Sequence, residues 1–170
     1  MLNASVLDQY PGVDTDAVQA LLEEKCRQDR HKIIVLDDDP TGVQTVHDVS
    51  VYTDWSYDSI KKGFEEDGKL FYILTNSRGF TVEQTTRAHL EIGETAAKVS
   101  EETGIDYVIV SRGDSTLRGH YPLETELLAR AEEKHRGRAV DGEIICPYFK
   151  EGGRFTIGNV HYVKYGNELI

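Results

Sequence analysis

The chain has 170 residues, of which 39% are hydrophobic and 29% are charged. This length suits one domain with a sizeable core, and the apolar fraction is too high for a disordered chain. Thirty acidic residues against nineteen Lys and Arg give a formal net charge of −11, which disfavours nucleic acid as a partner. No apolar run approaches the about 18 residues that span a membrane, so we expect no membrane partner.

The predicted elements alternate between helices and strands as far as residue 147. At 14–28, apolar residues recur at helical spacing after a polar capping residue, which predicts a helix. Beyond it, short apolar or alternating segments predict strands, and amphipathic segments predict helices. The last thirty residues are rich in glycine and β-prone, and they show no helical pattern. We expect strands at 32–37, 48–53, 69–75, 106–111 and 142–147, and helices that begin near Ser56, Thr81 and Pro122.

This alternation predicts an α/β fold: a mostly parallel sheet flanked by helices in three layers, with a β-rich C-terminal segment. Residues 1–30 are expected to form an N-terminal extension with a helix, and residues 31–170 the main domain. Right-handed crossovers place the C-terminal ends of parallel strands on one edge of the sheet, where such sheets bind their ligands. We call this edge the rim.

Polar segments that contain charges and glycines follow four of the five predicted strands. They span residues 37–42, 75–79, 111–119 and 147–154. If the strands are parallel, these segments meet at the rim and bring carboxylates close to guanidinium groups. The charged residues involved are Asp37, Asp38, Asp39 and Asp114, together with Arg78, Arg112, Arg118 and Arg154.

This mixture of side chains suits a small ligand that is both anionic and hydroxylated. Arginine binds a carboxylate or phosphate with two parallel hydrogen bonds, and Ser115 and Thr116 offer hydroxyls and backbone N–H groups to the same anion. Aspartates accept hydrogen bonds from ligand hydroxyls, and one of them can act as a general base. The sequence contains no GxxxxGK[ST], GxGxxG or HExxH motif, so we expect no nucleotide or metal site on this chain.

At these residues the sequence resembles the N-terminal domain of the four-carbon acid sugar kinases. The family pattern is a strand followed by DDxTG, then SR after a strand, then KxDSTLRG, and then a PxF segment that ends in GRxT. The corresponding segments here are Asp38–Gly42, Ser77–Arg78, Arg112–Gly119 and Pro147–Thr156, in the same order. The resemblance covers residues 32 to 170, with Arg112 where a lysine is usual.

The resemblance implies a kinase that uses ATP and Mg²⁺ to phosphorylate the terminal hydroxyl of threonate, erythronate or 3-oxo-tetronate. Both cofactors would bind mainly to a separate C-terminal domain, the expected partner. This chain, which looks truncated at Ile170, would bind substrate without turning it over. One of Asp38 and Asp39 is expected to be the catalytic base. The expected substrate-binding residues are Asp38, Asp39, Thr41, Ser77, Arg78, Arg112, Asp114, Ser115, Arg118 and Arg154.

Two other functions stay open. Residues 33–41 also fit the start of a haloacid-dehalogenase-type phosphatase, with Asp37 as nucleophile and Asp39 as acid and base, but this interpretation leaves 114–119 unexplained. The other is a non-catalytic domain that binds an acid sugar. Two distant cysteines and no secretory signal favour a cytoplasmic location, and an exposed sheet edge at the truncation would favour a homodimer.

Overall fold

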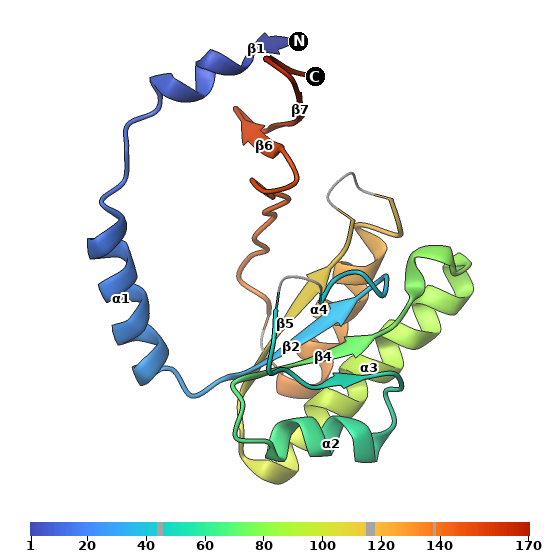
Figure 1. Ribbon diagram of the computed structural model, residues 1–170. Coiled ribbons are helices and arrows are strands. Elements are labelled where there is room, and N and C mark those ends of the chain that lie inside the picture. The colour runs from blue at the N-terminus through green and yellow to red at the C-terminus, as the bar shows by residue number, and fades with distance from the viewer. Residues whose placement is uncertain (44–45, 115–117, 138) are drawn as a thin grey trace. The chain divides into compact units, whose positions relative to one another are not determined.

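A computed structural model describes residues 1–43, 46–114, 118–137 and 139–170 (Figure 1). The chain divides into two compact units. One consists of residues 30–143, and the other combines residues 1–29 with residues 144–170. In the described residues, no helix has both the length and the apolar character needed to cross a membrane.

A parallel four-stranded sheet forms the centre of unit 30–143. Its strands lie in the order β3–β4–β2–β5, and β2 pairs with both β4 and β5. The register places Asp37, the last residue of β2, beside Leu74 on one side and Arg112 on the other. The strand ends therefore lie at one edge, as predicted. The bounds are β2 (Lys32–Asp37), β3 (Val51–Tyr52), β4 (Leu70–Leu74) and β5 (Tyr107–Arg112).

Two α-helices and one short 3₁₀-helix connect these strands, and a third α-helix follows the last of them. The side chain of Ser56 caps the first helix, and Thr81 and Gln84 form the predicted capping box of the second. Gly104 ends that second helix in the left-handed conformation, with φ of +69°. The predicted helix starts are confirmed. The bounds are α2 (Tyr57–Glu65), η2 (Ser77–Gly79), α3 (Val82–Thr103) and α4 (Leu123–Arg136).

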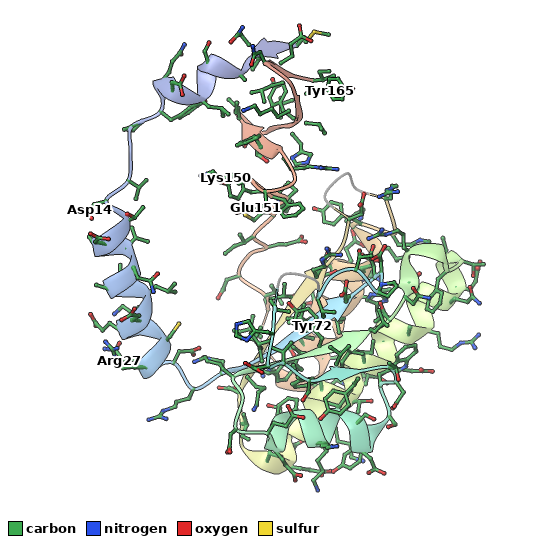
Figure 2. The ribbon with its side chains drawn as sticks, viewed as in Figure 1. Asp14, Arg27, Tyr72, Lys150, Glu151 and Tyr165 are labelled. Carbon is green, nitrogen blue, oxygen red and sulfur yellow. The ribbon has the colours of Figure 1, made fainter. Side chains whose placement is uncertain are left out.

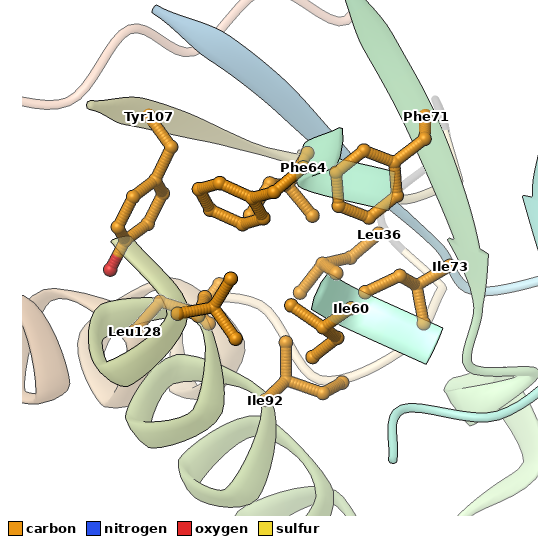
Figure 3. Packing of buried hydrophobic residues seen from close by; sticks show 11 residues of the cluster. Leu36, Ile60, Phe64, Phe71, Ile73, Ile92, Tyr107 and Leu128 are labelled. Carbon is orange, nitrogen blue, oxygen red and sulfur yellow. The ribbon is translucent and has the colours of Figure 1, made fainter. Parts of the chain in front are cut away.

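The core of this unit is one cluster where the helices meet the sheet (Figure 3). Each of the three helices contributes to it, with Ile60 from α2, Ile92 from α3 and Leu128 from α4. Burying a large apolar side chain contributes about 1.5–3 kcal/mol, so this cluster holds the strands in register. The fold is thus of the predicted α/β class. The strand residues of the cluster are Ile34, Leu36, Phe71, Ile73 and Tyr107.

Unit 1–29/144–170 contains an antiparallel sheet in the order β1–β8–β7–β6. The first strand pairs with the last, and Leu2 lies opposite the fully buried Leu169. The predicted helix at 14–28 is present as α1, which begins after Asp14 and has no buried residue (Figure 2). The bounds are β1 (Leu2–Asn3), η1 (Ala4–Gln9), α1 (Thr15–Gln28), β6 (Arg154–Ile157), β7 (Val160–Tyr165) and β8 (Glu168–Leu169).

Two predicted strands differ from the structure. Residues 142–147 form no strand, and Ile144 is 94% exposed. The strand predicted at 48–53 is reduced to Val51–Tyr52. A β-strand is stable only beside a hydrogen-bonded neighbour, and residues 142–147 have none in the part of the chain that the structure describes. An apolar run therefore indicates that a segment can form a strand, but it does not show which strand would pair with it.

Candidate functional site

Backbone hydrogen bonds join the loops that follow β2, β4 and β5. The Thr75 N–H donates to the Asp37 carbonyl at 2.9 Å, and the Arg78 N–H donates to the Asp38 carbonyl at 3.2 Å. The Asp38 N–H donates to the Arg112 carbonyl at 3.4 Å. These bonds extend the hydrogen bonding of the sheet into the rim, so the side chains of the rim have defined positions.

Arg78 is the centre of the charge pairs at the rim. Its Nε and Nη2 donate to the two carboxylate oxygens of Asp38 at 3.0 and 2.8 Å, and its Nη1 donates to Asp39 at 2.5 Å. The Asp38 side chain is only 4% exposed. A bidentate pair of this kind is strong and fixes the orientation of both partners. The hydrogen bonds that Arg78 donates to Asp38 also raise the pKa of Arg78, so this guanidinium stays charged.

Two further arginines carry the other pairs. Arg112 Nη1 lies 3.3 Å from Asp37 and 3.9 Å from Asp38, and about a third of its side chain is exposed. Arg118 binds Asp114 through Nε and Nη2 at 3.0 and 2.8 Å, and its side chain is 68% exposed. The rim therefore presents guanidinium groups to solvent while the carboxylates lie deeper.

Asp37 is buried beneath the loop that follows it. Its side chain is 2% exposed, and a Cβ added at Gly42 would lie 1.9 Å from its Oδ2. Only glycine fits at position 42 without displacing this carboxylate. Burial raises the pKa of Asp37, while the Arg112 guanidinium opposes that shift. A nucleophile must be reachable by its substrate, so this position argues against the phosphatase alternative.

The loop after β2 is held by short-range hydrogen bonds. The Thr41 N–H donates to Asp39 Oδ1 at 2.7 Å, and the Thr41 hydroxyl binds the same oxygen. These bonds lower the pKa of Asp39, so it is ionised and weakly basic. Below the rim, the hydroxyl of the buried Ser77 lies 2.9 Å from that of Thr75, which in turn donates to the Asp37 carbonyl. The side chains of Thr41 and Ser77 thus hold the loops after β2 and β4 in place.

Nine of the ten residues that the sequence analysis proposed for the substrate fall in unit 30–143, and the structure describes eight of these. Ser115, like Thr116, lies outside the described residues. Arg154 begins β6 in the other unit, where its Nη1 donates to the Gly152 carbonyl. Asp37 was counted among the rim carboxylates but not among the binding residues, and neither its burial nor its dependence on Gly42 has a local signal in the sequence.

A parallel sheet whose strand ends carry ordered aspartate and arginine side chains defines a ligand-binding α/β domain. The sequence matches the family of sugar-binding N-terminal domains over residues 33–170. The chain belongs to this family, which confirms the resemblance seen in the motifs. No curated protein and no solved structure matches the sequence.

Proposed function

We propose that this domain binds a four-carbon acid sugar of the threonate, erythronate or 3-oxo-tetronate type at the rim. In the full-length enzyme it would be the substrate-binding part of an ATP-dependent kinase acting on the sugar's terminal hydroxyl. Membership of the family supports sugar binding. The observation that carries the proposal is the set of arginine–aspartate pairs at the strand ends. Such a set offers donors to a carboxylate and acceptors to hydroxyls.

Arg112 is the best candidate to bind the ligand's carboxylate. Arg78 already uses Nε, Nη1 and Nη2 on Asp38 and Asp39, and Arg118 uses Nε and Nη2 on Asp114. Among the described contacts, Arg112 uses Nη1 alone. Its remaining N–H donors can form the two parallel bonds that a carboxylate prefers. Arg78 then acts as a positioning residue for the two aspartates.

Asp38 and Asp39 are assigned to the ligand's hydroxyls. Phosphoryl transfer depends mainly on positioning and charge neutralisation, and it places little demand on a strong base. That requirement suits two carboxylates that Arg78 holds rigidly in place. One of the two would orient the terminal hydroxyl and accept its proton as the phosphoryl group arrives.

ATP and Mg²⁺ are assigned in this proposal mainly to a separate C-terminal domain. Among the described residues, no group of three or more His, Cys, Asp or Glu side chains is arranged to hold a metal ion. The carboxylates of the rim are paired with guanidinium groups, which is not the donor set of a resident Mg²⁺. No step of the proposed reaction is therefore assigned to a metal on these residues.

Calorimetric titration of the chain with D-threonate and D-erythronate tests the proposal. We expect one of the two to bind, and Arg112→Ala to weaken that binding by at least about tenfold, because a charge-assisted hydrogen bond is lost. Arg130→Ala is the matched control, since this arginine is 70% exposed and pairs only with exposed Glu126 in the described structure. If neither sugar binds, or if Arg112→Ala leaves the affinity unchanged, the proposal is contradicted.

A further inference from the structure

A group of buried polar side chains lies on α3 and α4, outside the pairs described above. Thr85, His89 and Glu124 are 0%, 1% and 5% exposed. Thr85 Oγ1 and Glu124 Oε1 have no hydrogen-bond partner within the described structure. A buried polar atom without a partner costs about 1–3 kcal/mol, so native proteins retain few of them. This group needs a physical explanation.

The hydrogen bonds of the two nearby histidines show which of their ring nitrogens carry hydrogens. His89 Nδ1 lies 2.9 Å from the Thr85 carbonyl, and His120 Nε2 lies 2.8 Å from the Phe80 carbonyl. A carbonyl only accepts, so these two nitrogens carry the hydrogens and the opposite nitrogen of each neutral ring is an acceptor. The unpartnered Glu124 Oε1 is also an acceptor. A proton on His89 Nε2 would turn that acceptor into a charged donor.

Glu124 of this group lies next to the rim. A Cβ added at Gly119 would lie 3.5 Å from Asp38 Oδ2 and 3.9 Å from Glu124 Oε1, so the two carboxylates flank this glycine. Gly119 has φ of +115°, a conformation that favours glycine. An anion bound at the rim therefore makes the electrostatic potential at Glu124 more negative. Glu124 has no ion pair among the described residues.

The rim itself does not neutralise an added anion. Each of its aspartates already pairs with a guanidinium group. Its described carboxylates outnumber its guanidinium groups. An incoming carboxylate would add a further negative charge, and uptake of a proton nearby offsets that charge. The groups compared are Asp37, Asp38, Asp39 and Asp114, and Arg78, Arg112 and Arg118.

We propose that His89 and Glu124 form a proton-binding pair next to the rim, and that this pair takes up a proton from the solvent when an anionic sugar binds. The proton is taken up at His89 Nε2, and Glu124 acts by favouring the charged form of that ring. The other titratable groups that face the pair are His120, from the loop before α4, and Asp38, across Gly119 and bound to Arg78. The inference rests on the proposed function, because it requires an anion at the rim.

The direction of the pH dependence follows from the surroundings of His89. Burial lowers its pKa below the ordinary value of 6.5, the Glu124 carboxylate opposes that shift, and His120 adds to it. The His89 ring is therefore neutral at neutral pH before a sugar binds, and a bound anion favours its protonated form. Binding of the sugar should tighten as the pH falls from about 8 to about 6, by at most about tenfold per pH unit for one proton.

Calorimetry in two buffers with different ionisation enthalpies measures this proton uptake directly. With D-erythronate and D-threonate as ligands, we expect proton uptake near pH 6 and about threefold to tenfold tighter binding than near pH 8. Glu124→Gln should abolish both effects. Glu126→Gln removes the same charge from the same helical turn at an exposed position and should retain them. Persistence of the uptake in Glu124→Gln would overturn the inference.

An NMR titration of the His89 ring separates failure of this inference from failure of the proposed function. Because the Glu124 carboxylate favours the imidazolium, His89 should titrate at lower pH in Glu124→Gln than in the wild type, with no ligand present. An unchanged titration would overturn the pair. If His89 responds but neither sugar binds, the proposed function and the ligand-linked uptake fail, and the pair itself stands.

Discussion

The two units of the chain differ in what they bury, although both contain helices with apolar residues. Unit 30–143 packs three helices against a sheet and contains the hydrophobic cluster. In unit 1–29/144–170, Leu169 is buried, whereas Leu21 and Leu22 of α1 are each 54% exposed. The comparison shows that helical apolar spacing makes a core only where another element covers it. The rim lies on the unit whose strands are held by such a core, and fixed side-chain geometry requires that support.

The largest difference between the units should be seen in truncations of leucine. Leu36 is 2% exposed in the cluster, so Leu36→Ala should lower the free energy of unfolding by about 2–5 kcal/mol. Leu22→Ala in α1 should change it by no more than about 0.5 kcal/mol. Urea unfolding followed by fluorescence of the single tryptophan, Trp55, reports on the cluster against which it packs. Equal losses in the two variants would refute the comparison.

The next effect concerns the charge pairs of the rim. Arg78→Ala leaves Asp38 buried without its bidentate partner and should cost about 3 kcal/mol of stability. Arg130→Ala breaks an exposed pair on α4 and should cost less than about 0.5 kcal/mol.

A double variant tests the cause of that loss. Adding Asp38→Asn to Arg78→Ala removes the uncompensated charge and should restore part of the stability in urea unfolding. If the double variant is less stable than Arg78→Ala, the loss came from packing of the arginine stem instead of the buried charge.

A smaller effect is expected from a single methyl group at the rim. Gly42→Ala places its Cβ 1.9 Å from the Asp37 carboxylate, so the loop must shift, at a cost of about 1–3 kcal/mol. Gly113→Ala is the control in the same rim, because no heavy atom lies within 4 Å of its added Cβ. Thermal unfolding and sugar binding should both distinguish the two variants. Similar behaviour of both would show that the Asp37 carboxylate is free to move.

The local elements of unit 30–143 could be predicted from the sequence because their signals are local. The capping box at Thr81 and Gln84, the glycine that ends α3 and the apolar run of β2 all act within a few residues. The pairing of β1 with β8 joins the two ends of the chain, and no local pattern indicates it. For the same reason the apolar run at 142–147 predicted a strand that has no neighbour in the described structure.

The rim shows the same division between local and long-range information. Residue types at the strand ends predicted that aspartates and arginines would meet there, and they do. The sequence could not show which side chains pair. Arg78 was expected to bind the ligand, which stays a prediction, and the structure shows that its donors hold Asp38 and Asp39. Pairing depends on the register of β2, β4 and β5, which is set by packing of the whole unit.

The smallest predicted effect concerns one hydroxyl on the short strand β3. Tyr52 donates to Glu66 at 2.5 Å, and its ring meets Phe71 edge to face at 5.7 Å. Burial and the Glu66 carboxylate raise the pKa of Tyr52 to about 12 from an ordinary value of 10. The unfolded chain loses this proton at lower pH, so the contribution to stability is present below pH 10 and declines between pH 10 and about 12.

An alkaline ultraviolet titration checks this prediction. Tyr52→Phe should remove an ionisation step near pH 12 and flatten the decline in stability above pH 10. Tyr165→Phe, which alters a 79% exposed tyrosine of β7 in the other unit, should leave that step in place. Loss of the step in Tyr165→Phe, or its persistence in Tyr52→Phe, would show that the burial and the Glu66 contact do not set the ionisation of Tyr52. Unit 30–143 would then hold the Tyr52 hydroxyl no more firmly than the other unit holds the hydroxyl of exposed Tyr165.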